Sequence, residues 1–367
     1  MQMAARLFIP GPSDVDDTVL RELARPQLGH RTQEFRELFA SLRPGLRKLF
    51  STGNDVLIST SSGSGLWEAA IRSCVKSKVL HAVNGAFSKK WASLSKNCAK
   101  DMAALSFQDG KPVNPQAVDK ALSERDYEAF CVVHNETSTG VISDLGALSQ
   151  VMKKHPDVLF FVDAVSSLGG VKIEVDGLGI DICLASSQKA LALPAGIALA
   201  SISRRSYLKA EAVEGRGYYF DLLELKKAYD KDETPYTPSI PHLYALRKQL
   251  DRMEAEGLEF RYKRHEEMAS WVRAWAKEQG FPMFSQEGCH SPTVSCISNT
   301  KGIDFAAVKK ALAGRGITVD TGYRKLNEKL AAEEKPTTFR IAHMGERTPD
   351  EIRSYLAELQ KQFQVKP

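Results

Sequence analysis

The chain has 367 residues, of which 43% are hydrophobic and 26% are charged, and its formal net charge is +5. This composition is typical of a globular protein that is long enough for one large domain and a smaller one. The excess positive charge is not gathered into one basic block, which argues against a nucleic-acid-binding surface.

The sequence predicts neither a membrane span nor a metal or disulfide framework. The longest apolar stretch, residues 190–200, is too short to span a bilayer and contains Pro194. The first six residues lack the pattern of a signal peptide. The six cysteines form no CxxC pair, so a zinc or dithiol site is not indicated. We expect a soluble, cytoplasmic protein that binds no metal, no nucleic acid and no membrane.

Up to residue 200 the chain alternates apolar, strand-like runs with helical patterns. The apolar runs do not alternate with polar residues, which is typical of strands buried on both faces of a parallel sheet. The predicted strands are Val56–Ile58, Val79–Val83, Ala129–Val133, Val158–Val162 and the run over residues 181–189. The predicted helices are Leu66–Val75, Ser88–Cys98, Pro115–Leu122 and Ser143–Lys154. The alternation predicts an α/β fold with an open, mostly parallel sheet between helices.

After residue 200 the pattern changes to that of a smaller α+β domain. Three prolines, Pro235, Pro238 and Pro241, mark a connector. One long amphipathic helix, or a pair of helices, is predicted over Leu243–Lys277. The remaining predicted elements are the strands Thr293–Ile297, Gly316–Val319 and Thr338–Ala342 and the helices Asp304–Ala313 and Asp350–Phe363.

Lys189 stands between a run of small residues and another apolar stretch. Burial of an ammonium ion is costly, so a lysine in dry surroundings tends to lose its proton and becomes a nucleophile toward aldehydes. This pattern suits a lysine that forms a Schiff base. It also suits a lysine at a strand end that reaches solvent, and its immediate neighbours do not separate the two interpretations.

Polar residues follow two other predicted strands, at the edge of the sheet where ligands bind in open α/β folds. Asp163 either caps a following helix or pairs with a cation such as a protonated ring nitrogen. The segment Ser59–Gly65 is either a phosphate-binding helix start or a capped, flexible one. A dinucleotide fingerprint is disfavoured because Glu68 replaces its third glycine, and a nucleophile elbow because Ser62 replaces its first.

Two further residues have one functional and one structural interpretation. Phe87 follows a predicted strand and is either a core residue or a platform on which a ring stacks. Arg340 lies in the middle of the strand candidate Thr338–Ala342. Its guanidinium either binds a carboxylate through two hydrogen bonds or faces solvent from an edge strand.

In this order, the phosphate-loop candidate, the aromatic residue, the strand-end aspartate, the lysine and the distal arginine resemble the class V aminotransferases of fold type I. The resemblance is to the alanine/serine–glyoxylate (serine–pyruvate) aminotransferase group, and it covers nearly the whole chain. The motifs that carry it are Pro10–Ser13, Gly29–Thr32, Ser62–Ser64, Asn84–Gly85, Glu136–Gly140, Val162–Gly170, Ser187–Ala190, Thr237–Pro238 and Phe339–Ile341.

The resemblance implies a pyridoxal 5'-phosphate cofactor and a role for each matching residue. Lys189 would carry the cofactor as a Schiff base and move a proton between the substrate Cα and C4′ of the cofactor. Asp163 would pair with the ring nitrogen. Phe87 would stack on the ring, Val165 would pack on its other face, and Thr137 would approach its hydroxyl.

The same resemblance implies phosphate, substrate and subunit contacts. Ser62, Gly63 and Gln188 would hold the phosphate, with Ser64 at a position where some relatives carry His. Thr237 would reach the phosphate from a second subunit, so a homodimer with shared active sites is implied. Arg340 would bind the substrate carboxylate, with Gly11 and Pro12 lining the substrate side. The implied organisation is an N-terminal arm over residues 1–20, a large cofactor-binding domain over 21–245 and a small domain over 246–367.

The activity that the resemblance implies is a ping-pong transamination from a small amino acid, alanine or serine, to glyoxylate or pyruvate. A cysteine desulfurase is disfavoured because residues 301–339 contain no cysteine. Phosphoserine or aspartate with 2-oxoglutarate is an alternative that needs a second positive group. Arg31 or the basic segment 324–335, which is predicted as a loop and is otherwise a solvated surface insertion, would supply it. A catalytically idle partner subunit and a nicotinamide-dependent dehydrogenase are the remaining alternatives.

Overall fold

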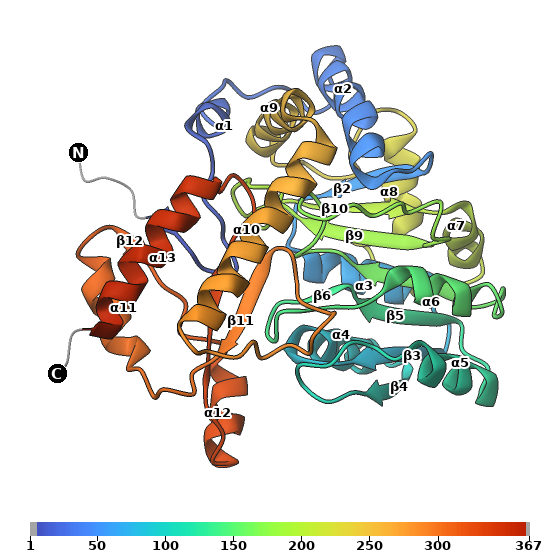
Figure 1. Ribbon diagram of the computed structural model, residues 1–367. Helices are drawn as coiled ribbons and strands as arrows, with labels where there is room; N and C mark the ends of the chain where they lie inside the picture. Colours follow the sequence, from blue (N-terminus) through green and yellow to red (C-terminus); the bar gives the residue numbers. More distant parts are fainter. Residues whose placement is uncertain (1–5, 365–367) are drawn as a thin grey trace.

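The computed structural model describes residues 6–364, and its centre is a seven-stranded sheet (Figure 1). The strand order is β2-β10-β9-β8-β5-β3-β4, and only β10 runs antiparallel to its neighbours. The strands are β2 (Asp55–Ser59), β3 (Lys78–Val83), β4 (Asp101–Ser106), β5 (Ala129–Val133), β8 (Leu159–Asp163), β9 (Ile182–Ser186) and β10 (Ala198–Ile202). The predicted mostly parallel sheet is therefore confirmed.

Two strands of this sheet escaped the sequence analysis for different reasons. β4 forms the edge of the sheet and alternates exposed with half-buried residues, so it shows no continuous apolar run. β10 is fully buried, but it follows the apolar stretch after Lys189 without a clear polar boundary. The strands were predicted from continuous apolar runs that end in polar or small residues, and neither β4 nor β10 shows such a run.

Helices cover both faces of the sheet, with α3 (Gly63–Cys74) and α4 (Ala86–Asn97) on one and α5 (Pro115–Glu124) and α6 (Leu145–Met152) on the other (Figure 1). α5 shows how the sequence fixes such a helix. Asn114 accepts a hydrogen bond from the Ala117 amide at 2.9 Å, and Pro115 occupies the first helical position. Short helices and strands complete this part of the chain: α1 (Asp17–Glu22), α2 (Gln33–Phe50), β6 (Asn135–Glu136), β7 (Val141–Ile142), α7 (Arg204–Glu211) and α8 (Leu222–Tyr229).

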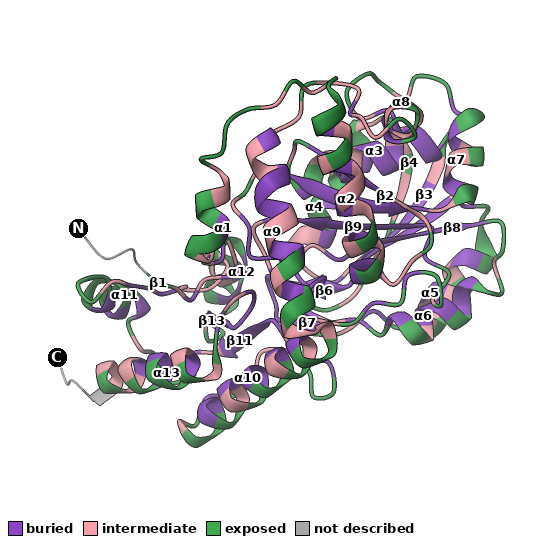
Figure 2. Cartoon of the chain, turned by 90° about the horizontal axis from the view of Figure 1, so that it is seen from above, coloured by how far each residue is buried: buried purple, intermediate pink, exposed green. Residues whose placement is uncertain are grey.

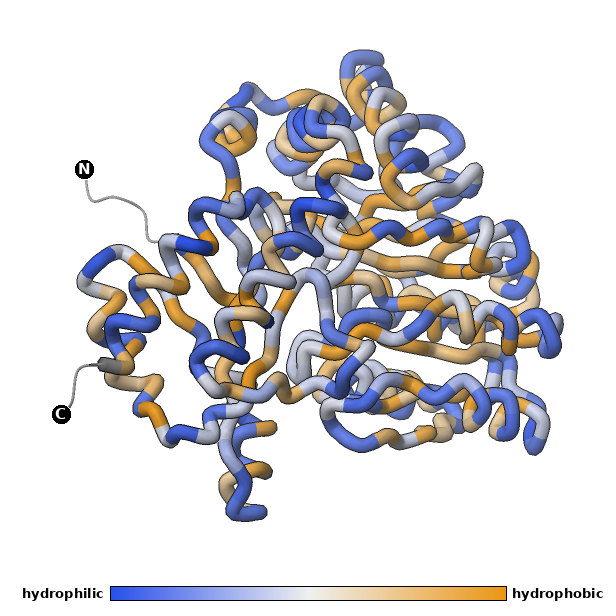
Figure 3. Tube along the Cα trace, viewed as in Figure 1, coloured by the Kyte–Doolittle hydropathy of each residue, from blue (hydrophilic) through white to orange (hydrophobic). Residues whose placement is uncertain are grey.

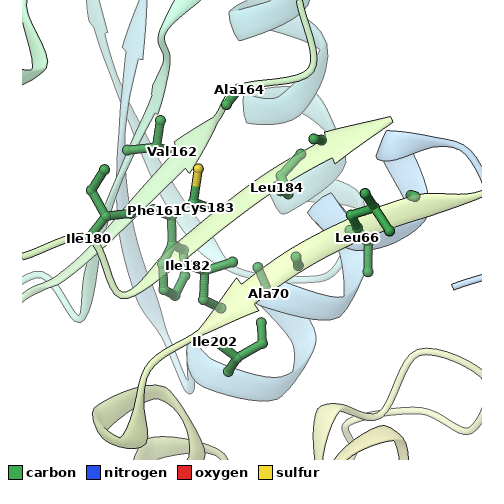
Figure 4. Packing of buried hydrophobic residues seen from close by; sticks show 14 of the residues in the cluster. Leu66, Ala70, Phe161, Val162, Ala164, Ile180, Ile182, Cys183, Leu184 and Ile202 are labelled. Carbon is green, nitrogen blue, oxygen red and sulfur yellow. The ribbon is translucent and has the colours of Figure 1, made fainter. Parts of the chain in front are cut away.

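The main hydrophobic core lies between this sheet and its helices, as the burial of the central strands shows (Figure 2). Apolar segments follow the strands through the same region (Figure 3). Leu66 and Ala70 of α3 pack over β9 and β10, near Leu184 and Ile202 (Figure 4). Within residues 6–364, no helix combines the length and the apolar character that crossing a membrane requires. The core fixes the strand ends, and the candidate site lies there.

The C-terminal part is a smaller α+β unit, as expected. The predicted long helix is a pair, α9 (Ile240–Glu256) and α10 (Leu258–Glu278), separated by Gly257 at φ +81°, a conformation that favours glycine. β11 (Val294–Ser298) pairs with β13 (Thr338–Ala342), and β1 (Arg6–Leu7) pairs with β12 (Ile317–Thr318). The other elements are α11 (Phe305–Ala313), α12 (Arg324–Ala332) and α13 (Pro349–Gln364).

The basic segment 324–335 differs from its predicted form, because most of it is the helix α12 and not a loop. Leu326 and Leu330 are buried and lie one helical turn apart, while the charged residues point outward. Most residues of the segment are charged, so the four-residue spacing of these two leucines was not recognised as a helical pattern.

Candidate active site

The sequence-predicted residues gather at the carboxyl edge of the sheet because the strands that precede them are parallel. The last residue of β2, the first of β10 and the last of β9 lie in one row, in the register Ser59–Ala198–Ser186. At or just after the ends of β2, β3, β5, β8 and β9 lie, in that order, Ser62, Gly63 and Ser64, then Phe87, Thr137, Asp163 with Val165, and Gln188 with Lys189.

Asp163 is the last residue of β8, and its carboxylate is buried under α3. The Val165 amide donates to Oδ1 at 2.7 Å, and Trp67 Nε1 donates to Oδ2 at 2.8 Å. Burial disfavours the charged form and raises the pKa of Asp163 to about 7, while these two bonds oppose the shift. The helix-capping interpretation fails because turns, and no helix, follow Asp163.

Lys189 keeps part of its surface open, but protein surrounds its amino group. Burial, and then the positive charge of Arg340, lower the pKa of Lys189 to about 8, and Asp163 opposes the shift. Nζ donates a hydrogen bond to the Pro10 carbonyl. Gly11 has φ +96°, and a Cβ there would lie 2.7 Å from Lys189 Nζ, so the N-terminal segment passes this close only with glycine. This segment is also anchored to Lys189, because Ser13 Oγ donates to the Lys189 carbonyl at 2.8 Å.

The start of α3 lies beside Asp163. A Cβ on Gly63 would lie 2.8 Å from a Val165 methyl carbon, which shows how closely the two segments approach. Ser62 is the N-cap and makes no side-chain capping bond. The amides of Gly63 and Ser64 have no acceptor among the described residues, and Ser62 and Ser64 are exposed. Gln188 accepts a bond from Ser186 Oγ at 2.6 Å. Free amides at a helix start make this place suited to an anion.

Phe87 is half-buried in the first turn of α4, and the buried carboxylate of Glu136 fixes that turn. Glu136 accepts from the amides of Phe87 and Ser88 and from Ser138 Oγ, the last at 2.6 Å. A Cβ on Gly85 would lie 2.4 Å from Glu136 Cγ, so only glycine leaves room for this carboxylate. The ring of Tyr323 lies 6.0 Å from that of Phe87.

Arg340 comes from β13, is only 7% exposed and does not face solvent, so the edge-strand alternative is wrong. Its Nε and Nη2 donate to the two carboxylate oxygens of Asp320, both at 2.9 Å. Its Nη1 donates to the Thr137 carbonyl at 3.0 Å. Thr137 Oγ1 lies 2.6 Å from Ser166 Oγ. Thr137 therefore links the C-terminal strand to the edge of the sheet.

Thr237 makes none of these contacts. It lines a shallow groove with Ser59, Thr60 and Tyr236, beside the end of β2. Thr60 Oγ1 accepts from the Ser239 amide at 3.0 Å, which ties the connector to that strand end.

The sequence analysis did not assign a function to four residues of this site: Trp67, Glu136, Asp320 and Tyr323. Trp67 carried a usable signal, because it lies one helical turn after Gly63 on the face toward the sheet. Glu136 belongs to a motif that was noted without a role for its carboxylate. Asp320 follows a strand candidate, but only the pairing of distant strands brings it to Arg340.

Known proteins share both the sequence and the fold. The aminotransferase class-V family model matches residues 18–354. An uncharacterized aminotransferase of Methanocaldococcus jannaschii is 38% identical over 92% of this chain and 87% of its own length. A serine–glyoxylate aminotransferase of Methylorubrum extorquens is 33% identical over 93% of this chain and 86% of its own length.

A solved structure, an aspartate aminotransferase of subgroup IV from Thermus thermophilus, is 30% identical with a TM-score of 0.87. It covers 97% of this chain and 98% of its own. The family match spans most of the chain, and the structural match extends over both the large sheet and the C-terminal unit. The chain belongs to the class V aminotransferases, enzymes of fold type I that use pyridoxal phosphate.

Proposed function

We propose that this protein transfers an amino group from alanine or serine to glyoxylate or pyruvate in a ping-pong reaction. The observation that carries the proposal is the placement, at one sheet edge, of a half-buried lysine and a buried aspartate whose pKa values are both shifted toward neutrality. The serine–glyoxylate aminotransferase of M. extorquens supports the choice of substrates.

The residues fit pyridoxal phosphate on two independent observations. Asp163 is buried with one donor on each oxygen, which leaves lone pairs for a protonated ring nitrogen. The unpaired amides of Gly63 and Ser64 suit a phosphate, with Ser62 and Gln188 beside them. Phe87 and Val165 would flank the ring, and Thr137 would approach its hydroxyl.

Bound pyridoxal phosphate supplies an aldehyde that links to amines and a ring that withdraws electrons from the substrate Cα–H bond. Lys189 Nζ accepts the Cα proton and later returns one, a role that needs the lowered pKa of this amine. Asp163 holds the proton at the ring nitrogen, because a nearby cation keeps its buried carboxylate ionised. Arg340 binds the substrate carboxylate, and Gly11, which lies directly against Lys189, lines the substrate side.

A small donor is favoured because most of the cations that the sequence offered for a second acidic group have partners elsewhere in the described residues. Arg31 donates to the carbonyls of Thr234 and Pro235. In α12, Arg324 faces Glu328, and Lys329 binds Asp109 at 2.8 Å. Neither group contacts Arg340 or Lys189 within the described part of the chain.

Lys90 supports a second candidate, an acidic donor such as aspartate or phosphoserine with 2-oxoglutarate. Its Nζ lies 5.0 Å from the centre of the Phe87 ring and 5.7 Å from that of Tyr323. It has no ion-pair partner among residues 6–364. Lys90→Ala would then raise KM for aspartate and leave KM for alanine unchanged, with Lys89→Ala from the same helix as the control.

The homodimer is part of the proposal. Tyr218 is 78% exposed, and Tyr219 stacks on Tyr236 beside Thr237. Large exposed aromatic side chains are typical of interfaces, which supports a second subunit that covers this face. Light scattering should give a dimer mass for the wild type and a smaller one for Tyr218→Ser/Tyr219→Ser.

A half-reaction screen tests the activity. The cofactor-loaded protein is mixed with single amino acids, and the visible absorbance of the bound cofactor is followed. We expect alanine or serine to deplete it and pyruvate or glyoxylate to restore it. Depletion by aspartate or phosphoserine alone would select the second candidate. A protein that binds the cofactor but responds to no amino acid would be the idle partner subunit.

A further inference from the structure

The carboxylate of Asp320 occupies the side of Arg340 that faces away from Thr137. The two residues are directly opposite each other, in an isolated antiparallel bridge between the end of β12 and β13. The Arg340 side chain is 9% exposed and that of Asp320 is 13% exposed, so water does not compete strongly for the ion pair. Asp320 is itself held by the chain, because its Oδ1 accepts from the Gly322 amide at 2.8 Å.

A guanidinium has five N–H donors. Asp320 takes one on Nε and one on Nη2, and the Thr137 carbonyl takes one on Nη1. One donor on Nη1 and one on Nη2 remain. The ring of Tyr323 lies 5.8 Å from the guanidinium carbon. Arg340 is thus held by Asp320 and by the Thr137 carbonyl, and two N–H donors on its terminal nitrogens have no acceptor among the described residues.

We propose that Asp320 is a positioning residue that presets Arg340 to bind one planar carboxylate through the end of its guanidinium. The inference rests on the proposed function, because it concerns how that site holds its amino-acid and oxo-acid substrates. Two donors in one plane match the two oxygens of a carboxylate. Asp320 also offsets the positive charge of Arg340, so this ion pair carries no net charge before substrate binds.

Asp320→Ala tests the inference through the split between KM and kcat. The loss of a charge-assisted bidentate anchor should raise KM for both substrates by roughly 10- to 100-fold, while kcat falls much less. Asp320→Asn keeps the acceptor for the Gly322 amide and should raise KM by less. Asp109→Asn is the matched control, since it removes an equal charge from the contact with Lys329 and does not touch Arg340.

Two readouts separate positioning from loss of structure. Acetate, used as a simple carboxylate probe, should perturb the absorbance of the loaded wild type at lower concentration than that of Asp320→Ala. Because Asp320 stabilises the charged amine of Lys189, which is free only after substrate has bound, its removal should move the acid limb of the kcat profile to lower pH. The thermal midpoint and cofactor content should stay close to those of Asp109→Asn.

An unchanged KM in Asp320→Ala would overturn the inference, and a lower KM would make Asp320 a competitor of the substrate instead. Should Asp320→Ala fail to fold, the same readouts on Asp320→Asn decide. If the wild type transaminates no amino acid, the proposed function fails, whereas acetate binding still reports whether Asp320 presets Arg340.

Discussion

Buried charges are treated in opposite ways at the sheet edge and at the junction with the C-terminal unit. At the junction, Arg261 is 1% exposed and donates to Glu256 and Glu346 at 2.8 and 2.9 Å. It also donates to the carbonyls of Gly169, Ala190 and Gly345. Arg264 binds Glu256 at 2.7 Å. We call these four charged residues, Glu256, Arg261, Arg264 and Glu346, the Arg261 cluster.

The pKa values show what the difference means. Burial alone would raise the pKa of Glu346, but Arg261, Arg252 and Gln249 lower it to about 2. Asp163 is buried as well, and burial raises its pKa to about 7, since none of the described residues bonds a cation to its carboxylate. Burial therefore pushes a carboxylate toward neutrality unless charges compensate it. In the Arg261 cluster, which we call saturated, all five N–H donors of Arg261 are used. Asp163 and Lys189 keep hydrogen-bonding capacity that a ligand can use.

The largest effect should come from Lys189→Ala. Because no other amine lies at this position, turnover should fall by at least about 10⁴-fold while the cofactor still binds without a covalent link. Steady-state assays and cofactor absorbance after dialysis measure the two quantities. Lys172→Ala, a change of an exposed lysine, is the control. Turnover that persists in Lys189→Ala would contradict the role of Lys189 as the Schiff-base and proton-transferring lysine.

Arg261→Met should be the largest structural effect, because it leaves Glu256 and Glu346 without their buried partner. The free energy of unfolding should fall by about 3–5 kcal/mol. Denaturant titration measures it, and Arg353→Met, which removes an exposed arginine, is the control. A loss below about 1 kcal/mol would contradict the view that this cluster is saturated and structural.

Asp163→Asn should have a smaller effect that depends on pH. In the cofactor-free protein the folded-state pKa of Asp163 is raised above its unfolded value of 3.8. The stabilising contribution of the neutral carboxyl is present below the unfolded value and is lost as the pH rises through about 7. The stability advantage of Asp163→Asn should therefore grow over this window by about 3 kcal/mol.

Denaturant midpoints at pH 4 and pH 7 test this, with Asp109→Asn as the control for a half-buried, ion-paired carboxylate. An equal difference at both pH values would show that Asp163 is already compensated in the cofactor-free protein. Turnover of the loaded Asp163→Asn should fall, since an amide cannot hold the ring-nitrogen proton by charge.

Local sequence patterns were enough for most strands and for the residues at their ends. Lys189 and Asp163 follow apolar runs, so their place at one sheet edge follows from parallel pairing alone. Asp320 and Glu136 were out of reach, because their partners Arg340 and Phe87 come from other segments of the chain. α12 was missed because its charged face dominates its composition and only two leucines mark its buried side.

The carboxylate of Glu136 makes the starts of two helices, α3 and α4, differ in their capacity to bind an anion. Both α3 and α4 begin at the same sheet edge, and each carries the partial positive charge of a helix start. At α4 the chain fills this place with its own anion, so the amides of Phe87 and Ser88 are used up. At α3 the amides of Gly63 and Ser64 stay free. An anion can therefore be bound by the amides at the start of α3 but not by those at the start of α4, which already bind Glu136. This difference fixes the orientation in which an anionic ligand enters the site.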